Sequence, residues 1–105
     1  MEKLQSVEQF EELKNEERTM FLFSADWCPD CRVIEPFLPG LEADYPEYQF
    51  VYVDRDEFID VCQQQDVFGI PSFIAFHNGE EAGRFVSKDR KTKEEIEAFI
   101  NGLSS

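Results

Sequence analysis

Residues 20–31 decide the fold and read Met20-Phe21-Leu22-Phe23-Ser24-Ala25-Asp26-Trp27-Cys28-Pro29-Asp30-Cys31. The first four of these residues are apolar without alternation, which is typical of a strand in a parallel sheet that helices cover on both faces. Two cysteines with two residues between them follow almost directly. The stretch therefore predicts a buried strand that leads into a helix whose first turn carries both cysteines.

This placement indicates thiol-disulfide chemistry. The N-terminus of a helix offers unpaired amides and a partial positive charge, and both favour a thiolate at Cys28. A free cysteine titrates near about 8.5, so stabilising the thiolate enlarges the population of the nucleophile at neutral pH. Cys31 follows one helical turn later, close enough to form a disulfide with Cys28 and release a bound partner.

Hydrophobic periodicity and turn signals give the remaining elements. We predict strands at residues 3–5, 20–23, 49–54, 72–77 and 82–86, and helices at 7–15, from the cysteines to about 45, at 57–65 and after 92. Asn78-Gly79 is typical of a type I′ hairpin turn. The order predicts a three-layer α/β sandwich with a mixed central sheet, formed as a single domain by residues 1–105.

Capping motifs and prolines in the sequence also predict where helices begin and end. Ser6-Val7-Glu8-Gln9 and Thr92-Lys93-Glu94-Glu95 both resemble capping boxes, in which the first and last side chains satisfy each other's backbone amides. Pro36 and Pro39 must kink or break the helix that follows the cysteines.

Composition excludes several functional classes. A net charge of −13 disfavours nucleic acid and anionic membrane surfaces, since both are bound by clustered Lys and Arg. No apolar run approaches the roughly 20 residues that span a bilayer, and the N-terminus lacks a basic region followed by an apolar one. We expect a cytoplasmic monomer that binds neither nucleic acid nor membrane.

Residues 25–31 resemble the active-site segment of the thioredoxin family, and the resemblance covers nearly the whole chain. Pro36 lies where thioredoxins have the proline that kinks the active-site helix. Ile70-Pro71-Ser72 resembles the family's cis-proline segment. Pro29-Asp30 differs from the Gly-Pro of ordinary thioredoxins and is similar to the Cys-Pro-Asp-Cys site of small bacterial thioredoxin-like proteins.

The resemblance implies a thioredoxin-like protein-disulfide reductase without a cofactor in the domain. Cys28 would attack a partner disulfide and Cys31 would resolve the mixed disulfide. Trp27, the backbone of Ile70 and a cis Pro71 would line the substrate groove. A flavin-dependent reductase fed by NADPH, or a low-molecular-weight thiol, would recycle the dithiol.

The chain departs from the family where protons are handled. The family's buried aspartate falls on Leu22, its accompanying lysine on Phe50, and its groove-lining glycine on Ser87. We predict that Asp30, next to Cys31, partly replaces the missing acid in catalysis. The alternative is that Asp30 only favours the first helical turn electrostatically.

Other interpretations stay open. Cys28 and Cys31 could be half of a zinc site with Cys62 and His77, or the fold could be a non-catalytic binding adaptor. Cys62 is otherwise read as a small core residue or a regulatory thiol, and His77 as solvated. Half of the ten basic residues lie close together and are read as a solvated loop, or as a patch that steers acidic partners: Arg84, Lys88, Arg90, Lys91 and Lys93.

Overall fold

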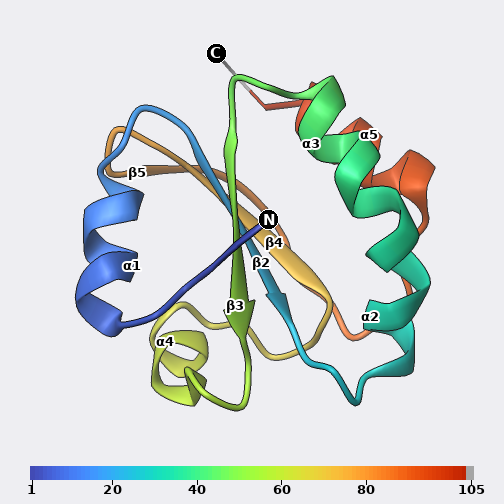
Figure 1. Cartoon of the computed structure of the whole chain (residues 1–105), viewed down its shortest axis with the longest axis horizontal. Coiled ribbons are helices and arrows are strands. Elements are labelled where there is room, and N and C mark those ends of the chain that lie inside the picture. Colours follow the sequence, from blue (N-terminus) through green and yellow to red (C-terminus); the bar gives the residue numbers. More distant parts are fainter. Residues whose placement is uncertain (104–105) are drawn as a thin grey trace.

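A five-stranded mixed sheet forms the centre of the computed structural model, which describes residues 1–103 (Figure 1). The strands lie in the order β1-β3-β2-β4-β5. Their bounds are β1 Glu2–Lys3, β2 Thr19–Ser24, β3 Gln49–Asp54, β4 Ser72–His77 and β5 Glu80–Phe85. The first three run parallel, whereas β4 is antiparallel to both β2 and β5.

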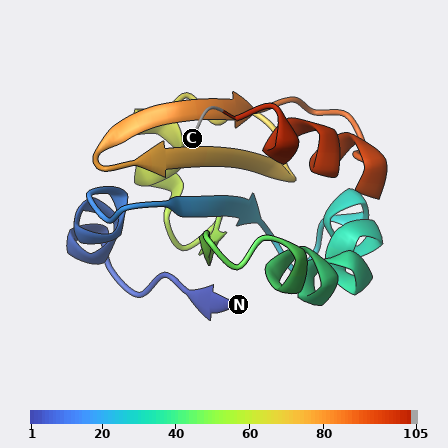
Figure 2. The ribbon, with the colours of Figure 1, turned by 90° about the horizontal axis from the view of Figure 1, so that it is seen from above.

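Helices cover both faces of this sheet, as Figure 2 shows. Helices α1 (Val7–Lys14) and α4 (Ile59–Gln64) lie on one face. On the other face lie α2 (Pro29–Ile34), α3 (Leu38–Asp44) and α5 (Lys93–Asn101). The predicted three-layer α/β sandwich is confirmed.

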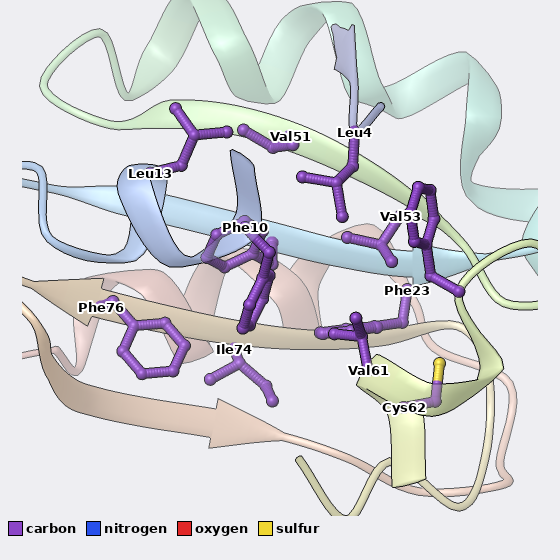
Figure 3. Packing of buried hydrophobic residues seen from close by; sticks show 12 residues of the cluster. Leu4, Phe10, Leu13, Phe23, Val51, Val53, Val61, Cys62, Ile74 and Phe76 are labelled. Atoms are coloured by element: carbon purple, nitrogen blue, oxygen red, sulfur yellow. The ribbon is translucent and has the colours of Figure 1, made fainter. Parts of the chain in front are cut away.

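Strand β2 is buried along its whole length, and its four central residues, 20–23, form the unbroken apolar run that predicts this burial. Phe21 and Phe23 point to the layer under α1 and α4, where they join the core that Figure 3 shows. Met20 and Leu22 point to the opposite layer, under α2, α3 and α5. Alternate residues of one strand thus supply both cores, because successive side chains leave a strand on opposite sides.

The two prolines divide the helix after the cysteines. A 3-10 segment, η1 (Glu35–Phe37), contains Pro36 and separates α2 from α3, which has Pro39 near its start. A proline lacks the amide that would bond the preceding turn, so the chain tightens and then resumes. The predicted break is confirmed.

Local side-chain bonds decide three boundaries. Ser6 Oγ accepts from the Gln9 amide at 3.0 Å, but Gln9 Oε1 accepts from Gln5 at 2.7 Å, so the predicted reciprocal bond to Ser6 is wrong. Thr92 and Glu95 form the full capping box. Helix α4 begins two residues later than predicted, because Asp54 Oδ1 accepts from the amides of residues 56 and 57 and holds them in a turn.

The hairpin turn has positive φ at both central residues, 54° at Asn78 and 90° at Gly79, as a type I′ turn requires. Strand β5 consequently begins immediately after it at Glu80, two residues earlier than predicted. A bulge between Ala75 and Phe76 adjusts the register. Within residues 1–103, no helix combines the length and apolar character needed to cross a membrane.

The core makes a stability prediction. Phe21 is fully buried, so Phe21→Ala should lower the free energy of unfolding by about 3–5 kcal/mol through lost burial and a residual cavity. Phe68 is 66 % exposed, and Phe68→Ala should change it by no more than about 0.5 kcal/mol. Guanidinium denaturation measures both, and equal losses would contradict this account of the core.

Candidate active site

Cys28 is the N-cap of α2, where the chain leaves β2 and begins to coil. Its backbone is extended (φ −82°, ψ 115°), and Pro29 is the first helical residue. The Cys31 amide donates to Cys28 Sγ at 3.3 Å. A helix-terminal amide thus already solvates the sulfur, which is the arrangement that favours negative charge on it.

The loop before β4 closes over this sulfur. The Ile70–Pro71 peptide bond is cis, and the Cys28 thiol lies 3.9 Å from the Ile70 carbonyl oxygen, to which it donates. The side chain of Ile70 packs against Ala25, Cys28 and Cys31. The structure therefore brings together the dithiol and the predicted substrate-binding segment.

Beside the dithiol lies a groove of about 330 Å³. Trp27 forms part of its wall, is 60 % exposed, and donates from Nε1 to Asp56 Oδ2 at 2.6 Å. Apolar side chains line other parts of the groove, among them the exposed Ile59 and Phe68 and the partly buried Ile70. An extended segment carrying an apolar side chain fits this surface.

The two cysteines differ in environment. Cys31 is fully buried, and burial is the main reason that its pKa is raised to about 11, followed by the hydrogen bond with Cys28. The Ser24 side chain and the Ala25 backbone oppose that rise. Cys31 is therefore a thiol at neutral pH and must lose its proton before it can attack.

A family model described as Thioredoxin matches residues 2–102. The chain belongs to the thioredoxin family. Human thioredoxin is 38 % identical over 81 residues, which cover 77 % of this chain and 74 % of that protein. The mitochondrial thioredoxin-2 of Schizosaccharomyces pombe is 32 % identical over 96 residues, covering 88 % and 72 %.

Solved structures of thioredoxins have the same fold as this chain. Plasmodium falciparum thioredoxin superposes with a TM-score of 0.87 over 99 % of this chain and 100 % of that one, at 22 % identity, and shows the fold. Fasciola hepatica thioredoxin gives 0.80 over 96 % and 98 %, at 27 % identity. Thioredoxins are protein-disulfide oxidoreductases, and this chain is a thiol-disulfide oxidoreductase.

The positions of the family's buried ion pair are apolar here. Leu22 and Phe50 are 1 % and 4 % exposed and belong to the core beneath α2, α3 and α5. Ser87, at the position of the family's groove glycine, lies against Gly69, where an added Cβ would come within 2.5 Å of the Ser87 carbonyl oxygen. The loop after β5 thus touches the Ile70–Pro71 segment.

Asp30 has a partner that the sequence did not indicate. Its Oδ1 accepts from Arg90 Nε at 2.9 Å, across 60 residues of sequence. The Asp30 side chain is 31 % exposed, and within residues 1–103 it has no hydrogen bond to Cys31. Its proposed part in catalysis therefore stays a prediction, now with Arg90 as a competing partner for the carboxylate.

Lys91 corrects the prediction of a wholly solvated basic loop. It is only 1 % exposed, and its Nζ donates to Ser87 Oγ at 3.1 Å, to the Ser87 carbonyl at 3.4 Å and to the Asp89 carbonyl at 3.2 Å. The ammonium also lies 5.0 Å from the centre of the Phe85 ring. Desolvation by burial lowers its pKa.

Cys62 and His77 are not members of the dithiol, although Cys62 lines the groove together with Trp27 and Ile70. Cys62 belongs to the core under α1 and α4 (Figure 3). It is 1 % exposed, and burial raises its pKa to about 11. His77 is not simply solvated, because its Nε2 lies 2.5 Å from the Tyr48 hydroxyl. Residues 1–103 hold no group of three or more His, Cys, Asp or Glu side chains suited to a metal ion.

The asymmetry of the thiols predicts selective alkylation. In native reduced protein at pH 7.5, iodoacetamide should modify Cys28 first, because Cys28 keeps 5 % exposure at the helix start, whereas Cys31 and Cys62 are 0 % and 1 % exposed and their pKa values are raised to about 11. Peptide mass mapping against time gives the order of reaction. Faster modification of Cys31 than of Cys28 would reverse the assignment of attacking and resolving thiols.

Proposed function

We propose that this chain reduces disulfide bonds of partner proteins through Cys28 and Cys31. The observation that carries the proposal is the Cys28 sulfur at the start of α2, bonded by the Cys31 amide and next to the Ile70 carbonyl. A nucleophile, a resolving thiol and an edge for a substrate backbone meet there.

The chemistry proceeds in two exchanges. The Cys28 thiolate attacks a substrate sulfur, so that a mixed disulfide forms and the first substrate thiolate leaves. Cys31 then loses its proton and attacks the Cys28 sulfur, which forms the Cys28–Cys31 bond and breaks the bond to substrate. The departing substrate thiolate takes up a proton. The substrate disulfide is reduced, and the enzyme dithiol is oxidised.

The substrate is proposed to bind as an extended segment. Ile70 would pair with it through its backbone, in the manner of an added strand, while Trp27 and Pro71 flank the reacting sulfur. Ser87 borders the same surface because its carbonyl lies against Gly69. This geometry supports Trp27, Ile70, Pro71 and Ser87 as substrate-binding residues.

Several broader features belong to the same proposal. We infer a single domain over residues 1–105 that works as a monomer, without a bound cofactor, and is recycled by a reductase or a low-molecular-weight thiol. Three cysteines are an odd number and do not make the paired framework of a small secreted domain, which supports a cytoplasmic location. A net charge of −13 opposes binding to nucleic acid or anionic membranes. The Pro29-Asp30 pair suggests the Cys-Pro-Asp-Cys branch of the family.

Insulin reduction tests the proposal. Wild-type protein should catalyse it with dithiothreitol as reductant, Cys28→Ser should abolish turnover, and Cys31→Ser should accumulate mixed disulfide. Cys62→Ser should keep dithiol-dependent turnover, because Cys62 takes no part in either exchange and is 1 % exposed, although it lines the groove. A wild-type protein without dithiol-dependent turnover would instead indicate a binding adaptor.

Asp30 allows a second test. If its carboxylate helps to deprotonate Cys31, Asp30→Asn should slow release of the mixed disulfide and speed the first attack, since a nearby carboxylate disfavours a Cys28 thiolate. Arg90→Gln is the matched control, because it breaks the same ion pair but keeps the carboxylate. Stopped-flow kinetics separate the two steps. Unaltered release in Asp30→Asn would leave Asp30 as a helix-start residue only.

A further inference from the structure

Lys91 is a buried charge that the exchange chemistry above does not use. In residues 1–103 it is the only buried side chain that carries a charge, and no carboxylate lies within 4.0 Å of its Nζ. Three oxygen acceptors and the Phe85 ring replace part of its lost hydration. A buried ammonium without a counterion is costly, and an anion appearing nearby would relieve that cost.

The segment that carries Lys91 lies between the two halves of the active site. On one side, Arg90 bonds Asp30 in the first turn of α2. On the other side, the Ser87 carbonyl packs against Gly69, directly before Ile70. The ammonium bonds this same Ser87, so it lies on the inner side of the loop.

The ion pair between Arg90 and Asp30 brings the sequence neighbours of Lys91 and Cys31 together at 2.9 Å, so the first turn of α2 lies against the segment that carries Lys91. Four groups raise the pKa of Lys91 through their negative charge, namely Asp89 of its own loop, Cys31 and Asp30 of α2, and Glu95 of α5. Asp89 and Glu95 are exposed to solvent, and Asp30 is bonded to Arg90. Cys31 is the only one of the four that is fully buried and that gains negative charge during the reaction. At such a site, opposite charges interact more strongly than at the surface.

We propose that the Lys91 ammonium stabilises the Cys31 thiolate during resolution of the mixed disulfide. This inference rests on the proposed function. Lys91 transfers no proton: the Cys31 proton goes to solvent, the Cys31–Cys28 bond forms, and the departing substrate thiolate takes up a proton. The positive charge that stabilises the thiolate therefore comes from the loop after β5. Leu22 and Phe50, in strands β2 and β3, carry no charge that could do so.

The step needs such help because burial opposes it. Desolvation by burial is the main reason that the pKa of Cys31 is raised, and Cys31 stays buried when Cys28 is bonded to substrate, so only a small fraction is thiolate at neutral pH. If the loss of Lys91 reduces that fraction about tenfold, release slows about threefold, because a more basic thiolate is also a better nucleophile. This separates the proposal from a purely structural role, in which Lys91 only holds the loop in place.

The test follows both exchanges in one stopped-flow trace. Reduced protein is mixed with one equivalent of a symmetric aryl disulfide whose free thiolate is coloured, so that attack releases the first equivalent and resolution the second. Lys91→Met keeps the length and apolar stem of the side chain and removes the charge. Lys88→Met is the matched control, because it removes the same charge from an exposed position of the same loop.

We expect Lys91→Met to slow the second phase about threefold at pH 7 and to leave the first phase within about 1.5-fold, with the deficit narrowing as pH rises toward the raised pKa of Cys31. Lys88→Met and the charge-conserving Lys91→Arg should resolve at close to the wild-type rate. Circular dichroism checks that each variant folds. If Lys91→Met does not fold, Lys91→Gln replaces it under the same criteria.

A second phase that is equal in Lys91→Met and Lys88→Met, or a deficit that does not change with pH, overturns the role of Lys91. Wild-type turnover of insulin then still stands as support for the reductase. Absence of any second phase in wild-type protein, by contrast, overturns the proposed function itself.

Discussion

The burial of β2 in the middle of the sheet is the constraint on which the active site depends. Parallel pairing with β3 fixes all six of its residues, and antiparallel pairing with β4 fixes five of them. The chain can only leave the sheet at Ser24 and turn into α2, so Cys28 comes to the helix start. The same β4 pairing sets Ser72 beside Phe23 and thereby brings the Ile70–Pro71 segment to the cysteines.

Much of this arrangement could be predicted because it is encoded locally. The apolar run of β2, the Asn78-Gly79 turn, and the Thr92 capping box each specify their structure within a few residues. The later start of α4 could not be predicted, since it depends on which amides the Asp54 carboxylate accepts from. At such positions one side chain has several nearby donors, and the pattern of residue types does not choose among them.

The largest differences between the sequence predictions and the structure concern charged side chains. Arg90 and Lys91 are adjacent in a basic stretch, yet one is exposed and bonds Asp30 while the other is buried under Ser87. The Arg90 contact spans 60 residues of sequence, whereas Lys91 bonds Ser87 and Asp89 of its own loop, and composition indicates neither outcome. Leu22 and Phe50 lie where the resemblance to thioredoxins places a buried ion pair, and they add apolar contacts to one core. Among the described residues the one buried charge, on Lys91, belongs to the loop after β5 and not to a strand.

The contact at Gly69 has a consequence for engineering. A Cβ at this position would lie 2.5 Å from the Ser87 carbonyl oxygen and 2.8 Å from the Lys88 Cα, so no other residue fits without backbone movement. The loop that contains Ile70 and Pro71 therefore packs in direct backbone contact with the loop after β5, and the shape of each loop depends on the other. Grafting a substrate loop from another thioredoxin onto this scaffold requires both loops to be transferred as a pair.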